Sequence, residues 1–432
     1  MKNVDLSKIK RAHFAGIGGI GVSAIARMML AEGKIVGGSD TSDSAIIDEL
    51  RKLGAKIFLG HNADNVAEDV DLLVYTPALT ADNPELKKAV EMGIPTLSYP
   101  EMLGLISKDK YTIAISGAHG KTTTTAMIAK ILIDAGLDPT VIIGSLLKDN
   151  KSNFVAGKSR YFVVEACEYK KSFLNLNPKI IVITNIDNDH LDYYGNLENV
   201  KKAFGEFAAK LPKEGYLVCD PNDENLKDII KEAKFKIIDY TKVNNNFSLK
   251  IPGEHNIKNA QAAIVAAEIL GVDSKKAENS LESFEGTWRR FEFKSETKNG
   301  VLVYDDYGHH PTEIKATLKG AREFFGGKKI WCVFQPHLYS RTKLLLNDFG
   351  KSFSYADEII LADIYAAREP KDEGINSKML AEEIIKNGGK ARYMESFDKI
   401  TGFLVENSKK GDVVITTGAG DIYKIGENLL KK

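Results

Sequence analysis

The 432-residue chain has few cysteines and no excess of either charge. Cys167, Cys219 and Cys332 lie far apart and form no CxxC pair, which argues against a disulfide framework and against a zinc site. Lysine plus arginine and aspartate plus glutamate number 59 each, so no global field favours nucleic acid or an anionic membrane. No apolar run is long enough to span a bilayer. We therefore expect a cytoplasmic protein that binds neither nucleic acid nor membrane.

The chain also lacks the short motifs of two hydrolase classes. It contains neither GxSxG nor HExxH, which excludes the usual serine hydrolase and zinc peptidase arrangements. Short-period repeats and low-complexity tracts are absent as well. A chain of this length and ordinary composition is expected to hold about three globular domains.

Apolar runs that alternate with helical patterns predict parallel α/β sheets covered by helices on both faces. The predicted strands are 11–15, 34–37, 56–59, 72–75, 111–115, 161–164, 179–184, 329–334, 358–361 and 413–416. The predicted helices are 22–32, 45–53, one that starts near Ala126, and 260–270. A domain boundary is expected near 98–110.

Residues 116–125, SGAHGKTTTT, are the most informative stretch because they join an apolar run to a helical pattern. Gly117 and Gly120 let backbone N–H groups turn toward an anion, and the following helix adds its positive N-terminus. Lys121 would neutralise β/γ-phosphate charge, and Thr122 would offer a hydroxyl to Mg²⁺. The spacing GxxGKT is two residues shorter than the common GxxxxGKT, which indicates a variant phosphate loop. A simple helix cap is the alternative.

A second glycine motif follows the first predicted strand. Gly16, Gly18 and Gly21 form GxGxxG, and Asp40 follows the next strand. The pattern is typical of dinucleotide-binding folds, although any diphosphate-linked ligand can use the same turn and helix N-terminus. Tight packing of strand against helix is the alternative for these glycines.

Two candidate metal ligands also follow predicted strands. Glu165 ends the strand at 161–164, where its carboxylate can reach a metal on the nucleotide. His190, among Asp187, Asp189 and Asp192, can coordinate a second cation or position substrate. An exposed loop acid and a structural histidine are the alternatives.

Other polar groups suit a nucleotide. Asn256 and Asn259 lie one helical turn apart, and their amides can contact an adenine edge unless Asn256 only caps the helix. Arg290, beside Arg289, offers a planar fork for phosphate or carboxylate, and the acids of 305–313 suit ribose hydroxyls or a cation.

Together these motifs resemble the Mur ligase family of peptidoglycan synthesis over essentially the whole chain. In family order they are GIGGIG, GAHGKTT, TNIDNDHLD, EHN, RRF, DDYGHHPTE, FQPH and GAGD. The resemblance implies three α/β domains. These are an N-terminal Rossmann-like domain for the UDP-sugar (1–107), a central P-loop ATPase domain (108–292) and a C-terminal Rossmann-like domain that admits the amino acid (293–432).

The resemblance also implies an ATP-dependent ligation. ATP phosphorylates the lactyl carboxylate of UDP-N-acetylmuramate, and the amine of L-alanine attacks the acyl phosphate, with release of ADP and phosphate. This order is reasonable because a carboxylate is a poor electrophile until one oxygen becomes phosphate, and phosphoryl transfer requires positioned cations. We expect ATP, two Mg²⁺ sites in which Mn²⁺ can substitute, and a monomer or weak homodimer.

Residue roles are carried over from the family by position. The phosphate loop would contact the nucleotide through Gly117, Ala118, His119, Gly120, Lys121, Thr122 and Thr123. Asn256 and Asn259 would contact adenine. Arg290 would contact the transferring phosphate, and Asp306 the ribose of the nucleotide. Thr122 and Glu165 would bind the first Mg²⁺, and His190 the second. The UDP-sugar would contact Gly16, Gly18, Gly19, Gly21 and Asp40. Tyr307, His309 and Arg341 would surround the alanine. The catalytic set is Lys121, Glu165, His190, Arg290 and Asp306.

Two positions depart from the family pattern. Many members have arginine where Leu338 stands, so the alanine or acyl-phosphate contacts can differ here. Several sister ligases carry a carbamylated lysine at the position of Phe204, fourteen residues after His190. Although Lys201 and Lys202 are close, we predict no carbamylated lysine.

Three alternatives stay open at this point. A related ligase attaches a preformed peptide to the same UDP-sugar. A dinucleotide-dependent oxidoreductase would explain the N-terminal glycines and Asp40, but not the Lys121 loop. A nucleotide-binding regulator without catalysis would not need Glu165, His190 and Arg290 together.

Overall fold

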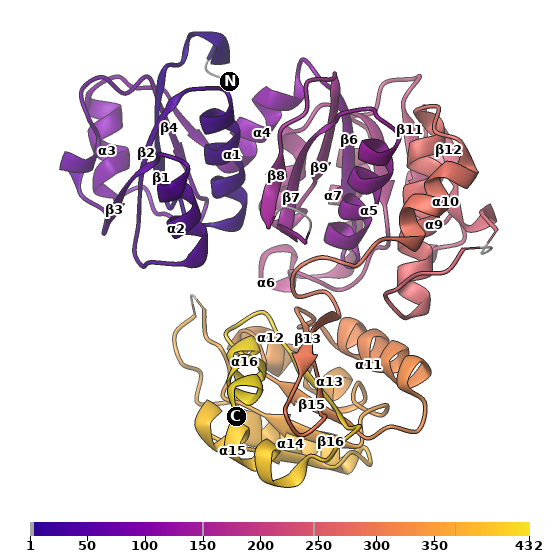
Figure 1. The fold of residues 1–432 in the computed structure, drawn as a ribbon. Coiled ribbons are helices and arrows are strands. Elements are labelled where there is room, and N and C mark those ends of the chain that lie inside the picture. Colours follow the sequence, from indigo (N-terminus) through magenta and orange to yellow (C-terminus); the bar gives the residue numbers. More distant parts are fainter. Residues whose placement is uncertain (1–3, 149–150, 245–246, 368) are drawn as a thin grey trace. The chain divides into compact units, whose positions relative to one another are not determined.

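The computed structural model describes residues 4–148, 151–244, 247–367 and 369–432. Among these residues, strands form three sheets of five, seven and six strands, and helices flank each sheet (Figure 1). The described residues separate into two compact units. Unit 1 comprises the described residues of 4–148, 151–188, 196–244 and 260–281, and unit 2 those of 189–195, 247–259, 282–367 and 369–432. The first two sheets belong to unit 1 and the third to unit 2, which confirms the predicted three-part α/β fold.

The first sheet is parallel, with strand order β3-β2-β1-β4-β5. Its strands are β1 (Arg11–Ala15), β2 (Ile35–Asp40), β3 (Lys56–Leu59), β4 (Leu72–Tyr75) and β5 (Thr96–Ser98). The helices of this part are η1 (Leu6–Lys8), α1 (Ile20–Ala31), α2 (Ala45–Lys52), η2 (Ala63–Asn65), α3 (Pro84–Glu91) and α4 (Tyr99–Ser107). The last of these covers most of the segment in which a boundary was expected.

The second sheet has the order β12-β11-β10-β6-β9-β7-β8 and is parallel except for the pair β7–β8. Its strands are β6 (Tyr111–Ser116), β7 (Thr140–Leu147), β8 (Ser152–Val155), β9 (Tyr161–Glu165), β10 (Pro178–Ile183), β11 (Tyr216–Cys219) and β12 (Lys236–Asp239). The helices in this stretch are α5 (Lys121–Asp134), η3 (Tyr169–Asn175), α7 (Leu197–Ala208), η4 (Glu224–Leu226), α8 (Lys227–Lys231), η5 (Tyr240–Lys242), α9 (Glu254–Ile269) and α10 (Ser274–Glu282).

The third sheet has the order β13-β14-β18-β15-β16-β17, and only the pair β13–β14 is antiparallel. Its strands are β13 (Glu292–Glu296), β14 (Leu302–Asp306), β15 (Ile330–Phe334), β16 (Glu358–Leu361), β17 (Ala391–Tyr393) and β18 (Val413–Thr417). The helices of unit 2 are α6 (Leu191–Tyr194), α11 (Pro311–Phe325), α12 (Tyr339–Leu344), α13 (Leu346–Gly350), α14 (Ser377–Lys386), α15 (Phe397–Asn407) and α16 (Tyr423–Lys431).

Alternating side chains of the third sheet build a core on each of its faces. Cys332 of β15 packs into a cluster with residues of α11, α13 and α14, whereas Trp331 and Val333 pack with residues of α15 and α16. A parallel sheet buried on both faces requires this pattern, and it explains why the strands read as continuous apolar runs.

Most predicted elements lie within three residues of their observed bounds, and β1, β3, β4 and β16 match them. The prediction for α5 was wrong, because the helix begins at Lys121 rather than near Ala126. Gly120 adopts a left-handed conformation with φ of 84° and ends the loop directly before Lys121. Helix α9 also begins six residues earlier than predicted, at Glu254. The predicted domain boundaries at 107/108 and 292/293 stay predictions.

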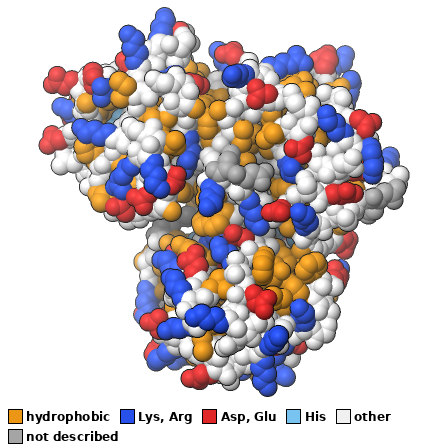
Figure 2. Space-filling view, in the orientation of Figure 1, with side chains coloured by type: hydrophobic (Ala, Val, Ile, Leu, Met, Phe, Trp, Pro, Cys, Tyr) orange, Lys and Arg blue, Asp and Glu red, His pale blue; other side chains and the backbone are white. Residues whose placement is uncertain are grey.

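The surface shows the balanced charge of the sequence. On the face drawn in Figure 2, basic and acidic side chains are interspersed rather than segregated by sign. No helix among the described residues combines the length and apolar character needed to cross a membrane.

Candidate active site

The loop between β6 and α5 has the geometry of a phosphate loop. Gly117 has φ of 134°, and a Cβ there would lie 2.1 Å from Thr184 Oγ1, so only glycine fits. Gly120, the N-cap of α5, has no side chain that could accept from the first-turn amides. Because those amides have no intrahelical acceptor, the helix N-terminus offers donors and positive potential to an anion.

Asn185, to which the sequence analysis assigned no role, fixes this loop. Its side-chain oxygen accepts from the backbone N–H of His119 at 3.0 Å, and its backbone oxygen accepts from Ala118 at 3.1 Å. The His119 ring contacts Asp187 Oδ2 at 2.9 Å. Asn185 and Asp187 follow β10, the strand beside β6. Their position directly after a buried strand was the only feature of the sequence that could have indicated this role.

Lys121 is held by the loop and by a buried carboxylate. Its Nζ donates to the backbone oxygens of Gly117 and Ala118, the latter at 3.0 Å, and to Glu168 Oε1 at 2.8 Å. Burial by itself lowers the pKa of Lys121, but the charge of Glu168 more than offsets this and the net shift is upward. Lys121 is therefore a cation at neutral pH. Glu168 was missed because a contact with Lys121 across 47 positions leaves no local pattern.

Glu165 and Thr122, the predicted ligands of the first Mg²⁺, lie side by side. Glu165 ends β9, and its Oε2 accepts from Thr122 Oγ1 and from the backbone N–H of Gly144, each at 2.9 Å. A Cβ at Gly144 would lie 2.8 Å from the carboxylate oxygens, so the strand can approach this closely only with glycine. A carboxylate and a hydroxyl side by side are the oxygen ligands that Mg²⁺ prefers, and this donor set fits the metal.

The N-terminal glycine turn is also formed. Gly16 has φ of 78° and donates to the backbone oxygen of Ser39 at 2.9 Å, and Gly18 N–H donates to Asp40 Oδ2 at 2.9 Å. Gly21 lies inside α1, where a Cβ would be 2.6 Å from the Tyr99 ring. Packing against Tyr99 accounts for that glycine. The ligand contacts predicted for Gly16, Gly18, Gly19, Gly21 and Asp40 stay predictions.

In unit 2, Asp306 organises the loops at the end of β14. Its Oδ2 accepts from Phe291 N–H at 2.9 Å, and its Oδ1 accepts from Gly308 N–H at 2.8 Å and from Thr317 Oγ1 at 3.2 Å. The side chain is 6% exposed. The carboxylate therefore joins three segments of the chain, and the predicted ribose contact stays a prediction.

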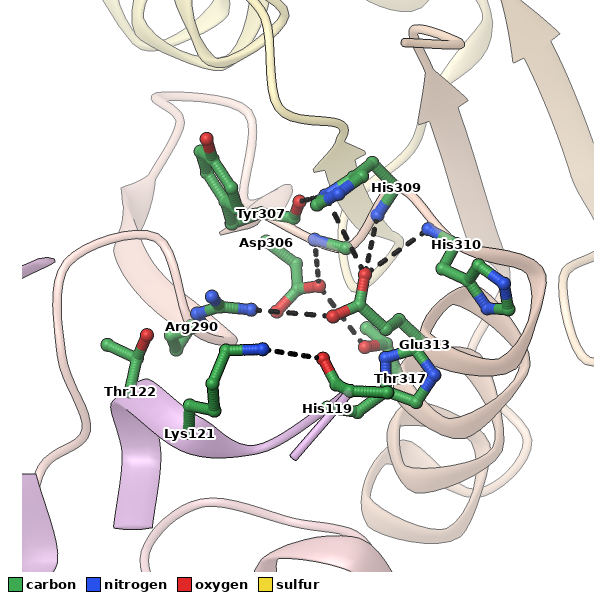
Figure 3. A network of polar contacts seen from close by, with 12 residues as sticks. His119, Lys121, Thr122, Arg290, Asp306, Tyr307, His309, His310, Glu313 and Thr317 are labelled. Atoms are coloured by element: carbon green, nitrogen blue, oxygen red, sulfur yellow. Dashed lines mark hydrogen bonds and ion pairs between the residues drawn. The ribbon is translucent and has the colours of Figure 1, made fainter. Parts of the chain in front are cut away.

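Glu313 organises the loop that carries Tyr307 and His309 (Figure 3). Its Oε2 accepts from the backbone N–H groups of His309 and His310 at 3.0 and 3.2 Å, and its Oε1 lies 3.9 Å from Arg290. The Arg290 guanidinium lies over the Tyr307 ring at 5.2 Å. The structure thus places Arg290 beside Tyr307 and His309, and the roles predicted for these three residues stay predictions.

His309 is neutral at pH 7. Burial is the main cause that lowers its pKa to about 4, and the charge of Arg341 contributes. Its Nδ1 lies 3.1 Å from the Tyr307 carbonyl oxygen. Because a carbonyl can only accept, Nδ1 carries the proton and Nε2 presents a lone pair.

Arg341 and His190 share one carboxylate. Asp189 Oδ1 accepts from Arg341 Nη2 at 3.0 Å and from His190 N–H at 2.8 Å. Arg341 Nη1 also lies 3.1 Å from Nδ1 of His337. His190 adopts a left-handed conformation with φ of 55° at the start of α6. The sequence analysis named Asp189 only as a neighbour, but it positions both residues.

The remaining site predictions concern Asn256 and Asn259. Both are nearly buried, at 5% and 6% exposure, and Asn259 Nδ2 lies 3.4 Å from Asn256 Oδ1. Asn256 lies within α9, and its Nδ2 donates to the backbone oxygen of Pro252, before the helix, at 2.6 Å, so Asn256 is not the N-cap. The adenine contact stays a prediction.

The two departures from the family pattern are both buried. Leu338 is 3% exposed and has φ of 70° at the N-cap of α12. Phe204 is fully buried and meets the Phe173 ring edge to face, with ring centres 5.4 Å apart. Lys201, near Phe204, is ion-paired with Glu198 at 3.0 Å. The predicted lack of a carbamylated lysine stays a prediction.

Comparison with known proteins gives matches along the whole chain. Residues 11–111 match the Mur ligase family catalytic domain, 115–248 the Mur ligase middle domain and 289–420 the Mur ligase glutamate ligase domain. The UDP-N-acetylmuramate--L-alanine ligase of Caldanaerobacter subterraneus subsp. tengcongensis is 46% identical over 99% of each chain.

Two solved structures are similar over 98% of both chains. The UDP-N-acetylmuramate-alanine ligase of Thermotoga maritima has a TM-score of 0.81 and 30% identity. The murein peptide ligase of Psychrobacter arcticus has a TM-score of 0.72 and 25% identity. With the three sheets and the phosphate loop already described, these matches lead to one conclusion: the chain belongs to the Mur ligase family.

Proposed function

We propose that this protein uses ATP to join L-alanine to the lactyl carboxylate of UDP-N-acetylmuramate, through an acyl phosphate. The observation that carries the proposal is the 46% identity, over 99% of both chains, with a relative named for this activity. The murein peptide ligase, whose name describes a peptide ligase, is 25% identical. The Lys121 loop supports nucleotide chemistry, which a dinucleotide-dependent oxidoreductase would leave unexplained.

The residues of unit 1 bind and neutralise the triphosphate in this proposal. The loop 117–123 supplies backbone donors, and Lys121, kept cationic by Glu168, balances charge on the β/γ-phosphates. Thr122 and Glu165 would hold Mg²⁺, which draws charge from the transferring phosphoryl group when bound. Glu165 is already fixed by Thr122 and Gly144, so its carboxylate needs little reorganisation to serve as a ligand.

The residues of unit 2 orient the amino acid and the acyl phosphate. Arg290 offers its fork to the transferring phosphate, and the Arg341 guanidinium attracts the alanine carboxylate. His309 presents a neutral Nε2, which can accept a hydrogen bond from the alanine nitrogen without repelling its positive charge. His190 would serve as a ligand of a second Mg²⁺.

Phosphate release tests the proposal against its alternatives. We expect release from ATP only when UDP-N-acetylmuramate and L-alanine are both present, measured with purified protein and Mg²⁺. Release with neither substrate would indicate a simple nucleotide hydrolase, and release with a peptide but not with alanine would indicate the peptide-attaching ligase. Either result would contradict the proposal.

Changing His190 to alanine should weaken the dependence on Mg²⁺. Loss of an outer-shell partner of a metal ligand costs about 10–100-fold in metal affinity, so loss of the ligand itself is expected to raise the Mg²⁺ concentration for half-maximal phosphate release by at least that factor. Tyr193→Phe is the matched control, because Tyr193 lies in the same short helix and is 45% exposed. An unchanged Mg²⁺ titration in His190→Ala would count against the ligand role.

A further inference from the structure

A buried arginine without a hydrogen-bond acceptor lies in helix α1 of unit 1. Arg27, on the third turn of this helix, is only 8% exposed. Its Nε is fully buried and has no hydrogen-bond partner among the described residues. The terminal Nη atoms also lack a partner in the described part of the chain, but they are not fully buried. The side chain therefore presents its terminal fork at a small opening in the surface.

A guanidinium in this state is unfavourable. Arginine stays protonated in proteins and can only donate hydrogen bonds. A charge removed from water destabilises the folded chain unless it is paired and hydrogen-bonded. Burial is the main cause that lowers the pKa of Arg27, and the charge of Glu49 opposes it only in part. The residues packed around Arg27 therefore do not supply the anion that its charge requires.

The charges nearest to Arg27 are mostly positive. Glu49 of α2 is half exposed, and its Oε1 accepts from Lys52 Nζ at 2.7 Å. Lys52 is the main cause that lowers the pKa of Glu49, and the charges of Arg27 and Lys151 add to it. Three cations thus act on one carboxylate that is bonded to Lys52. Arg27 and Lys151 are left without a bonded carboxylate among the residues that the structure describes.

The elements around Arg27 are held together by packing and by hydrogen bonds. Helix α1 packs against β7, β8 and α2 within unit 1. Asn153 of β8 donates from Nδ2 to Ser23 Oγ at 2.9 Å and to the backbone oxygen of Ile20. Ser23 and Arg27 lie on the same face of α1, and helical side chains lean toward the N-terminus of their helix. Arg27 therefore extends along a seam that Asn153 already fixes.

We propose that the Nη atoms of Arg27 bind inorganic phosphate, with Lys151 as the second cation, at a site formed by α1, α2 and the start of β8. The planar guanidinium fork matches two oxygens of a phosphate ion. Lys151 adds the second positive charge that suits a dianion, whereas a monocarboxylate would balance only one of the two cations. The small opening at Arg27 admits an ion rather than a large ligand.

This site goes beyond the proposed function and is separate from the glycine turn. Arg27 lies eight residues after Gly19, the N-cap of α1, which corresponds to about 12 Å along the helix axis. The ion at Arg27 is therefore not the diphosphate of a ligand bound at that turn. Because it would contact three elements of unit 1 in the folded state only, bound phosphate should stabilise this part of the chain.

Hydrogen exchange of the full chain, read by mass spectrometry on peptides from α1 and β8, tests the site. Phosphate at ten times its dissociation constant should slow this exchange about tenfold, as a ligand of the folded state does. Sodium chloride keeps the ionic strength equal in all samples. Because phosphate can also bind at the Lys121 loop, the titration is repeated in Lys121→Ala, which should keep the response. Arg27→Met should lose it.

Exchange without phosphate separates a ligand site from a structural role. In phosphate-free buffer Arg27→Met should exchange more slowly in α1 than the wild type, because it removes an unpaired buried charge and keeps an apolar stem. Phosphate should remove or reverse this difference by stabilising the wild type alone. If Arg27 were only a packing residue, Arg27→Met would exchange faster in both buffers, and that outcome would contradict the proposal.

Two controls define the chemistry of the site. Arg51→Met is the matched variant, because Arg51 of α2 is 36% exposed and already pairs with Asp43 at 2.7 Å, and it should keep the full response to phosphate. Acetate at the same concentration should protect these peptides much less than phosphate. Equal protection by acetate and phosphate, or an equal phosphate response in the wild type and Arg27→Met, would overturn the inference.

Discussion

Replacing Lys121 with alanine is expected to lower kcat by roughly 10³–10⁵-fold, the range in which a single cation acts on a transferring phosphoryl group. Lys121 follows the glycine turn at the first position of α5, where its Nζ is ordered by two loop carbonyls and by Glu168. The positive charge is therefore already in place before the phosphoryl group is transferred. Water that filled the space left by Lys121 would have to reorient to supply the same stabilisation. Alanine-dependent phosphate release at saturating substrates measures the effect.

Two variants separate chemistry from damage to the fold. Lys130→Ala lies on the same helix and removes an i,i+4 pair with Asp134 at 3.0 Å, so it should leave kcat within about twofold. The double variant Lys121→Met/Glu168→Gln removes both charges of the buried pair. If the activity loss came only from leaving the Glu168 charge without Lys121, the double variant would recover turnover, and that recovery would contradict the assigned role.

Replacing Arg289 with methionine is expected to destabilise unit 2 by about 3–5 kcal/mol, as removal of one partner of a buried ion pair does. Its side chain is 4% exposed, and Nε donates to Asp305 Oδ2 at 2.7 Å. Nη1 and Nη2 donate to the backbone oxygens of Gly420 and Gly418. Both tryptophans, Trp288 and Trp331, belong to unit 2, so fluorescence during urea unfolding reports its stability.

The loss of stability in Arg289→Met should depend on pH. Burial raises the pKa of Asp305 to about 6, and the charge of Arg289 opposes that rise. Without Arg289 the pKa of Asp305 in the folded protein rises further. Near pH 5 the folded variant then binds a proton at Asp305, whereas the unfolded chain, with an ordinary carboxyl pKa, does not, and this binding stabilises the folded variant. The destabilisation should therefore be largest above about pH 7 and smaller near pH 5.

The controls for Arg289 use one exposed pair and one rescue. Arg392→Met breaks a pair with Glu358 in which the arginine side chain is 42% exposed, and should cost less than about 1 kcal/mol. Arg289→Met/Asp305→Asn removes both buried charges and should recover part of the stability. If Arg289→Met and Arg392→Met lowered the free energy of unfolding equally, the buried hydrogen bonds of Arg289 would contribute little to stability.

Local patterns in the sequence were enough to predict the strands and the phosphate loop. Strand β4 and the loop at 117–122 depend on apolar runs, glycines and one lysine within a few positions, and these fix backbone geometry wherever they occur. The position of Glu165 at the end of β9 was predicted for the same reason, because the end of a parallel strand lies at the ligand edge.

Neighbouring residues with the same chemistry could not be separated by sequence. Arg289 and Arg290 are adjacent guanidinium groups, yet the Arg289 side chain is 4% exposed and hydrogen-bonded to Asp305, whereas the Arg290 side chain is 26% exposed. Asp305 and Asp306 differ in a similar way, since one pairs with Arg289 and the other joins three loop segments. Successive side chains of β14 point to opposite faces of the sheet, which separates Asp305 from Asp306, and the pattern of acids alone does not show which face each one takes.

The sequence by itself determined the family, the order of its sheets along the chain and the nucleotide-binding loop, because each depends on residues close together in the chain. The tertiary structure alone decided which polar groups meet: Lys121 with Glu168, Arg341 with Asp189, and Glu85 with Ser39 and His13. These partners are 47, 152, 46 and 72 positions apart. Such pairs form only when packed sheets bring strand ends together and exclude the water that would otherwise satisfy each group.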